Sequence, residues 1–298
     1  MTLEEFKEIE KEANNNDALA INKLALCYED GEFVEKSESK TIELLEKSIS
    51  LGCPNAMVNL AQRIFEYDKS RALKLLNQAA EMGFFGAYFI LGLFSEKFDE
   101  KLKFYSKSAE LGYPTGCFYS GSMYYQMGAL NEAVKYWKLG ADLNDSECWH
   151  NLAIVHAKDF KDFEKAAFFS KKAFENGKEN DDELYEYFSI WSKIIHFFSN
   201  HKQEVKYWTN KKGFSDKIFT VSISAEQDIN ELSLLVLAPR YDESTMFPVS
   251  HAEVIKCKDF VKAMTDWDDY KTGIKSLKDI HPTQKAKYIV SILHYMGE

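Results

Sequence analysis

The chain has 298 residues, of which 45% are hydrophobic, and a formal net charge of −10. Hydrophobic residues at this level suffice for a continuous core, while 5 Pro and 14 Gly leave few breaks in a mostly helical chain. The acidic balance argues against nucleic acid and anionic membranes as partners, because binding to either requires a basic surface.

The N-terminal stretch MTLEEFKEIEKEANNND carries acids where a secretory signal has a basic segment followed by an apolar one. No apolar run approaches the length that spans a bilayer. The five cysteines are odd in number and share no repeat position, so we expect free, mostly buried thiols. We therefore predict a cytoplasmic protein without membrane insertion, in which residues 1–16 form an N-terminal helix or cap.

A nine-residue phrase, LLEKSISLG in its first copy, returns about every thirty residues, a period that is typical of a solenoid. Its last position is Gly or Asn in each of five copies, at Gly52, Gly83, Gly112, Asn144 and Asn176. Both residue types tolerate the left-handed backbone conformation that ends many helices. The phrase therefore predicts the second helix of each repeat and the place where it ends.

A six-residue frame that starts with a small residue and ends with a large and then a small one predicts the first helix of each repeat. It spans 20–25, 56–61, 87–92, 116–121 and 148–153, with a degraded sixth copy at 184–189. Its apolar residues recur three to four positions apart, as in an amphipathic helix. We expect an all-α fold over residues 17–214, an α/α superhelical solenoid of about six helix-pair repeats.

These features resemble Sel1-like repeats, which are relatives of the tetratricopeptide repeat. The resemblance rests on the frame, the KSAELG-like helix ends and the small residue that follows in LGCPNA, MGFFGA and LGYPTG. It covers about two thirds of the chain, Asp17–Phe214. The connections between paired helices are shorter than the family usually has, except in the first copy. The resemblance implies an adaptor or scaffold that binds another protein.

If the tetratricopeptide register applies, the third, seventh and tenth positions of the frame line a concave groove. We expect a partner to contact residues at these positions in the middle repeats, namely Gln62, Phe65, Phe89, Leu93, Phe118, Ser122, Tyr125 and His150. In the first copy the same positions are Asn22, Leu26 and Glu29. Exposed aromatic residues in such a number are typical of an interface. The alternative is that these side chains belong to the core between repeats.

Beyond Phe214 the periodicity stops, and we predict a small C-terminal module over residues 215–298. The run 217–224 alternates as a half-buried strand does, and 232–238 is a short apolar run that suits a paired strand, although a helix through 225–237 competes. The string at 205–208 repeats that at 134–137 and predicts one more second helix. A final helix is expected after His281-Pro282. The module is α+β, or alternatively an all-helical cap.

No constellation of residues in the chain predicts catalysis, a cofactor or a metal. His281-Pro282-Thr283-Gln284-Lys285 matches a string found in amino-group DNA methyltransferases, but no glycine-rich loop or Asn/Asp-Pro-Pro-aromatic motif accompanies it. The seven histidines are scattered, and none lies with cysteines or acids at the spacing of metal ligands. We therefore expect the protein not to be an enzyme.

The function we predict is a non-catalytic adaptor or scaffold that holds a protein or peptide in the groove. One alternative is an intracellular inhibitor of the immunity type, whose acidic wall would suit a basic enzyme. Another is an enzymatic activity in residues 215–298 that the repeats direct to its target. Self-association of the solenoid is a further possibility.

Overall fold

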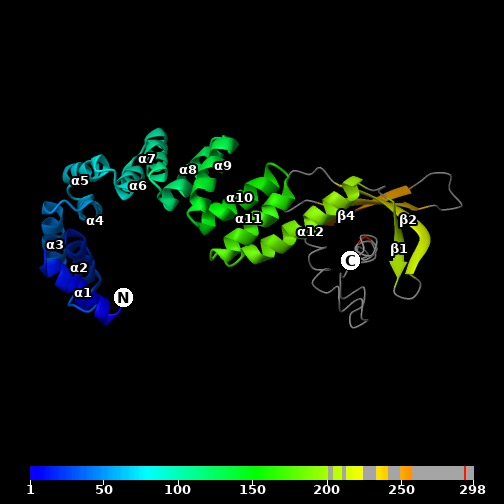
Figure 1. Cartoon of the computed structure of the whole chain (residues 1–298). Helices are drawn as coiled ribbons and strands as arrows, with labels where there is room; N and C mark the ends of the chain where they lie inside the picture. The colour runs from blue at the N-terminus through cyan, green and yellow to red at the C-terminus, as the bar shows by residue number, and fades with distance from the viewer. Residues whose placement is uncertain (201–203, 210–212, 224–232, 241–248, 257–291, 293–298) are drawn as a thin grey trace. The chain divides into compact units, whose positions relative to one another are not determined.

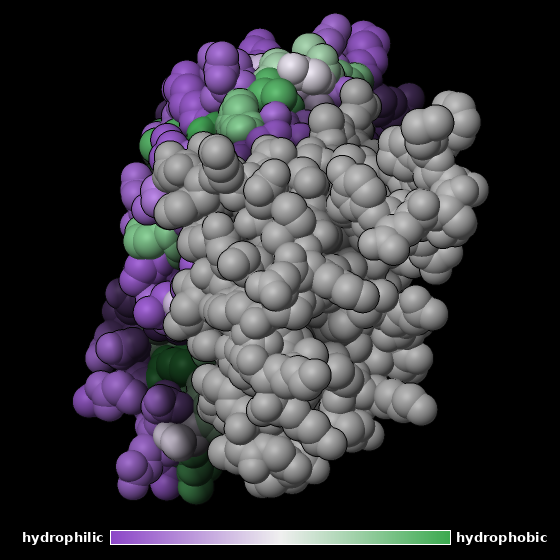
Figure 2. Space-filling model, turned by 90° about the vertical axis from the view of Figure 1, so that its right-hand side faces the viewer, coloured by the Kyte–Doolittle hydropathy of each residue, from purple (hydrophilic) through white to green (hydrophobic). Residues whose placement is uncertain are grey.

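A computed structural model describes residues 1–200, 204–209, 213–223, 233–240, 249–256 and 292. The chain divides into two compact units, Met1–Cys148 and Trp149–Glu298. No helix among the described residues is long and apolar enough to cross a membrane. Where the described residues are visible in Figure 2, hydrophilic side chains predominate and apolar ones form small separate patches.

The first unit is a series of helices, each packed on the next in sequence (Figure 1). The helices are α1 (Leu3–Asn14), α2 (Ala18–Asp30), α3 (Glu38–Ser50), α4 (Pro54–Ile64), α5 (Lys69–Glu81), α6 (Phe85–Phe94), α7 (Phe98–Glu110), α8 (Pro114–Gln126), α9 (Leu130–Asp142) and the start of α10 (Ser146–Lys158). The first helices of successive repeats also touch, since α4 contacts both α2 and α6. This is the helix-pair solenoid that the repeats predict.

Several helices begin or end where the sequence places capping residues. The side chains of Asp17, Ser37 and Asp68 accept hydrogen bonds from the free backbone N–H groups of α2, α3 and α5. The predicted left-handed conformation is confirmed at four copies of the phrase, at Gly52, Gly83, Gly112 and Asn144. In the fifth copy the prediction is one residue early. There Asn176 has a φ of −103° and the following Gly177 a φ of 97°.

Small residues allow neighbouring helices to approach closely. Ala80 and Ala109 are both buried. A Cβ added at Gly92 would lie 2.6 Å from the ring of Tyr105, so α6 and α7 meet at a position that only glycine fits. Of the five cysteines, Cys27, Cys53, Cys117 and Cys148 are buried and free, as expected, and Cys257 lies outside the described residues.

The second unit begins within α10 and continues with α11 (Phe163–Glu175) and α12 (Asp181–Asn200), which pack together. The degraded sixth frame lies inside α12, so a first helix is confirmed there. The second helix predicted at 205–208 is wrong, because those residues belong to strand β1 (Glu204–Thr209). The sequence EVKYWT is rich in the β-branched and aromatic residues that favour strands, and a four-residue match to 134–137 does not override that preference.

Four antiparallel strands follow in the order β1-β2-β3-β4. They are β1, β2 (Gly213–Ile223), β3 (Ser233–Arg240) and β4 (Val249–Lys256). In the central strand β2, Thr220 pairs with Glu204 on one side and Leu237 on the other. The strand predicted over 217–224 is confirmed up to Ile223, and the apolar run 232–238 is a paired strand from Ser233 onwards. The competing helix is wrong for residues 233–237.

The described strands give the C-terminal module the predicted α+β character. Ile292 is helical and buried, and the rest of the final helix expected after Pro282 lies outside the described residues. The domain boundaries at residues 16 and 214 stay predictions.

Candidate protein-binding surface

The predicted groove residues lie on the first helices α4, α6, α8 and α10, and they differ in exposure. Gln62 on α4 and Leu93 on α6 are exposed, the latter to 43%. The others are half-buried, namely Phe65, Phe89, Phe118, Ser122, Tyr125 and His150. Most of these side chains pack on neighbours and still present an edge to solvent. The interface interpretation and the core interpretation of the sequence therefore each describe some of the predicted groove residues.

Phe89 and Phe118 belong to an aromatic cluster on α6, α7 and α8. We define this aromatic cluster as Phe84, Phe85, Phe89, Tyr105, Tyr113, Phe118 and Tyr119. The ring centroid of Phe89 lies 5.6 Å from that of Tyr105, 5.3 Å from that of Tyr113 and 5.6 Å from that of Tyr119. These distances are those of favourable aromatic pairs. Phe89 is thus the central ring of the cluster.

The aromatic cluster extends from the core to the surface. Tyr105 is only 4% exposed, whereas Phe85 is 36% and Tyr119 is 37% exposed. The sequence prediction missed these two rim residues, because it considered only three frame positions in each helix. Phe85 lies just before the frame of its repeat and Tyr119 at its fourth position, so a scan of all aromatic residues near the frames would have found both.

Phe65 and Tyr125 make separate ring contacts. The ring of Phe65 stacks on Phe94 with 3.6 Å between centroids, and the ammonium group of Lys69 lies 5.4 Å from its centroid. Tyr125 lies 5.7 Å from the buried ring of Trp137. These contacts fix the orientation of both side chains at the surface of the helix pairs.

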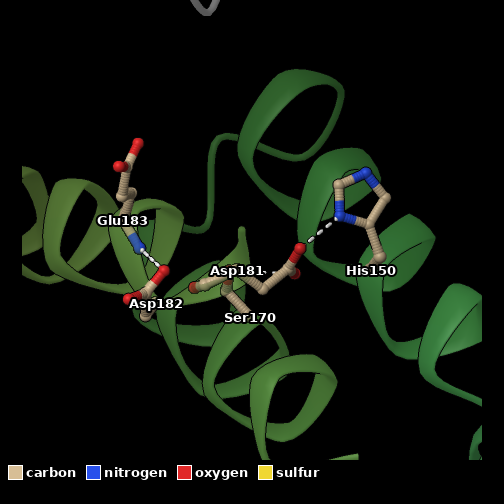
Figure 3. A network of polar contacts seen from close by, with 5 residues as sticks. All are labelled: His150, Ser170, Asp181, Asp182 and Glu183. Atoms are coloured by element: carbon tan, nitrogen blue, oxygen red, sulfur yellow. Dashed lines mark hydrogen bonds and ion pairs between the residues drawn. The ribbon is translucent and has the colours of Figure 1, made fainter. Parts of the chain in front are cut away.

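His150 has a structural partner in the second unit (Figure 3). Its Nδ1 lies 2.8 Å from Oδ1 of Asp181, whose side chain is fully buried. The hydroxyl of Ser170 donates to the backbone oxygen of Asp181 over 3.0 Å and to its Oδ2 over 3.2 Å. The carboxylate therefore joins α10, α11 and the start of α12.

This network does not have the geometry of a nucleophilic triad. In such a triad the imidazole accepts the proton of the serine hydroxyl. Here the carboxylate of Asp181 lies between the two groups, and the hydroxyl of Ser170 donates to aspartate rather than to His150. The arrangement satisfies a buried charge, which is costly to leave without hydrogen bonds.

The described residues provide no group of three or more side chains suited to hold a metal ion. The thiols of Cys117 and Cys148 are also poor nucleophiles, because burial raises the pKa of Cys117 to about 11 and that of Cys148 still further. The chemistry of the described side chains thus suits binding better than covalent catalysis.

Two cavities open on the first unit. One, of about 510 Å³, lies between α1 and α2, with Ile9, Leu26 and several acids in its lining. The other, of about 690 Å³, is lined by residues of α6 to α9, including Tyr124 and Tyr136, whose rings stack with centroids 5.3 Å apart. Leu26 was expected at the wall of the first repeat, and the sequence prediction missed Ile9, Tyr124 and Tyr136.

The family model described as Sel1 repeat matches residues 18–53, 54–84, 102–113, 114–145 and 150–178. Repeats of the Sel1 and tetratricopeptide type generally mediate protein–protein interaction and are typically non-catalytic. No curated protein matches the chain.

Solved structures of similar fold come from several bacteria. A Sel1 repeat protein from Oxalobacter formigenes is 21% identical with a TM-score of 0.50, and the match covers 64% of this chain and 90% of that one. A protective antigen of uropathogenic Escherichia coli with an SLR fold is 21% identical, with a TM-score of 0.48 and coverage of 65% and 44%. An immunity protein from Pseudomonas aeruginosa is 21% identical, with a TM-score of 0.47 and coverage of 57% and 73%.

The matched repeats, the helix pairs and the shared fold of the Oxalobacter formigenes protein agree with one another. The chain therefore contains Sel1 repeats at five positions between residues 18 and 178.

Proposed function

We propose that this protein is a non-catalytic adaptor that binds a partner protein on the apolar surface of α6 and its neighbours α4 and α8. The observation that carries the proposal is the composition of α6. Its sequence, FGAYFILGLF, contains no charged residue and no polar side chain except the hydroxyl of Tyr88. A helix that is apolar on all sides is either fully buried or part of an interface.

In the first unit α6 is not fully buried. Ala87, Ile90 and Leu91 face the core, whereas Phe85 and Leu93 are exposed and Phe89 is half-buried. Exposed apolar surface that adjoins an aromatic cluster is typical of protein interaction sites. A partner that covered this side of α6 would remove from water the apolar surface that the solenoid leaves exposed.

The matches to the family model support the same location. The longest gap between the matched segments is residues 85–101, which contain all of α6. The flanking helices α5 and α8 match, and the fold continues through the gap without interruption. This segment, which the family model leaves unmatched, thus contains the most apolar helix of the first unit, as expected where a partner as well as the repeat scaffold determines the residues.

A charge placed on α6 tests the proposal. Leu93→Lys puts an ammonium group at an exposed apolar position, so folding should be retained while a partner that covers Leu93 is repelled. The matched control is Leu51→Lys, since Leu51 is exposed to a similar extent on the turn after α3. Both variants and the wild type are used as bait in affinity capture from the native cell, followed by mass spectrometry.

We expect a protein that the wild type and Leu51→Lys retain and that Leu93→Lys loses at least tenfold, a loss of about 1.4 kcal/mol or more. Capture that is the same with all three baits would contradict the proposal, provided that circular dichroism shows the same helix content in each.

A cytoplasmic location remains part of the proposal, supported by the four free, buried cysteines that a reducing compartment maintains.

The narrower predictions, an immunity-type inhibitor of a basic enzyme and an activity in residues 215–298, stay predictions. The captured protein would distinguish the first of these from a general adaptor, because it would be an enzyme that the chain inhibits.

A further inference from the structure

The cavity between α1 and α2 is built from two matching stripes of side chains. On α1 the stripe is Glu5, Glu8, Ile9 and Glu12, and on α2 it is Lys23, Leu26, Cys27 and Asp30. Each set follows the spacing i, i+3, i+4, i+7, which places its members along one face of a helix. Ile9 on α1 and Leu26 and Cys27 on α2 lie at the centre of the stripes and form an apolar floor, whereas Glu8 and the charged residues at both ends of the stripes form the rim.

The rim is strongly acidic and only partly neutralised. Residues 1–32 contain nine acidic and three basic residues. Glu8 is paired with Lys11 at 2.9 Å, and Glu32 lies 3.3 Å from the amino group of Met1. Within the part of the chain that the structure describes, Glu5, Glu12 and Asp30 have no ion pair. Glu5 accepts a hydrogen bond from the backbone N–H of Thr2, which leaves Glu12 and Asp30 with neither a cation nor a hydrogen-bond donor among the described residues.

The negative potential reaches the floor of the cavity. The pKa of the Cys27 thiol is raised, first by burial and then by the charges of Glu32 and Asp30. These carboxylates therefore act on a group that is itself only 5% exposed. A positive charge in the same place would be stabilised by the potential that disfavours the thiolate.

From this geometry we infer that the cavity between α1 and α2 binds a lysine- or arginine-bearing segment of the partner protein. The long side chain of either residue has an apolar stem and a charged head. Its stem would lie on Ile9 and Leu26, and its head would reach Glu12 or Asp30. The inference rests on the proposed function, of which it specifies the chemistry of the partner.

The cavity fits a side chain better than it fits a single metal ion. In the described residues no three acids lie close enough together to ligate one ion, whereas a flexible basic segment can satisfy carboxylates that are spread along a rim. The volume of about 510 Å³ also falls within the range of about 300–1,000 Å³ that is usual for ligand pockets.

The test measures binding of a labelled oligolysine peptide with one central leucine to the full-length chain by fluorescence anisotropy. The pocket variant, Glu12→Gln with Asp30→Asn, removes the two lining carboxylates that have neither a cation nor a hydrogen-bond donor in the described part of the chain. Its matched control, Glu81→Gln with Asp142→Asn, removes the same charge from exposed residues outside the cavity. A glutamate peptide of the same length is the control for the probe.

We expect the pocket variant to raise the Kd for the lysine peptide about fivefold and the control variant to leave it within about twofold. Carbodiimide coupling of the bound peptide should form amides at Glu12 and Asp30, identified by mass spectrometry. The inference is overturned if both double variants weaken binding equally, if neither does, or if the amides form only outside the cavity.

The probe does not require α6, which separates this test from that of the proposed function. Leu93→Lys should leave the Kd for the lysine peptide unchanged. A pocket variant that binds the peptide as the wild type does overturns only the inference about the cavity. Capture of the natural partner that is unaffected by Leu93→Lys contradicts only the proposed site on α6.

Discussion

Single residues determine how closely neighbouring helices approach in this solenoid. Gly140 on α9 is the clearest case, because a Cβ added there would collide with the sulfur of Cys148 and the Cβ of Cys117. Gly52 is different, since its φ is 83° and a Cβ would meet nothing within 4 Å. One glycine is therefore required by packing and the other by its backbone conformation.

Alanine at these two positions separates the two effects. We expect Gly140→Ala to lower the free energy of unfolding by about 2 kcal/mol through overpacking, and Gly52→Ala to lower it by about 1 kcal/mol through backbone strain alone. Urea unfolding followed by circular dichroism measures both values. Equal costs, or no cost at Gly140, would contradict the close approach of α9 and α10 within the first unit.

The buried thiol of Cys117 makes stability depend on pH in the alkaline range. Burial raises its pKa from an ordinary value of 9.0 to about 11, and the nearby charge of Asp145 adds to the effect. The folded chain thus holds the thiol proton more tightly than the unfolded chain does. The resulting stability is complete below about pH 9 and is lost as the pH rises towards 11.

We expect the wild type to lose on the order of 2 kcal/mol more than Cys117→Ala when urea unfolding at about pH 8 is compared with that at about pH 11. Tyr105 and Tyr136 also have pKa values raised by burial, but both proteins contain them, so their effect cancels in the difference. A loss that is the same in both proteins would show that Cys117 ionises normally.

At the scale of elements, α6 combines a packing role with a binding role. Phe89 is the central ring of the aromatic cluster, whereas Leu93 is exposed near the end of the helix. Phe89→Ala should therefore reduce both the free energy of unfolding, by about 2 kcal/mol, and partner binding. Thermal unfolding and capture of the partner measure the two effects. Unchanged stability would show that the aromatic contacts do not stabilise the helix.

The start of α12 is held to α10 and α11 by one buried carboxylate. Asp181 is 0% exposed and interacts with His150 and Ser170, whereas its neighbour Asp182 is exposed. We expect Asp181→Ala to lower the free energy of unfolding by about 3 kcal/mol, because it removes both side-chain contacts, with His150 and Ser170, and leaves polar groups buried. Asp182→Ala is the matched control, with a change within about 0.5 kcal/mol in urea unfolding.

The sequence was sufficient to predict the regular helices and strands. It was insufficient where a match of a few residues suggests a different structure from the one that the composition of the segment favours. Gly52, Gly83 and Gly112 mark helix ends because no other residue type adopts a positive φ as easily. The last two copies of the nine-residue phrase match the first copies less well. In the copy that ends at Asn176, the adjacent Gly177 takes the left-handed conformation instead. The 205–208 string shows the same difficulty, since its similarity to 134–137 was outweighed by its strand-forming composition.

The candidate site could be predicted only in part, for a related physical reason. Frame positions predict which residues face the expected groove, and of these residues Leu93 and Gln62 are exposed. They do not give the depth to which a large ring sinks between its neighbours, which depends on contacts between repeats such as that of Phe89 with Tyr105. The acidic cavity depends on how α1 packs against α2, and α1 precedes the repeats.

For the molecule as a whole, the central claim is that the Sel1 repeats bind a partner protein through α6. Hydrogen–deuterium exchange of the full chain, with and without the captured partner, tests it most directly, because a covered helix exchanges its amide hydrogens more slowly. We predict slower exchange in peptides that cover Phe85–Phe94, together with peptides of α4 and α8. Protection confined to residues 204–256, with α6 unchanged, would contradict the claim.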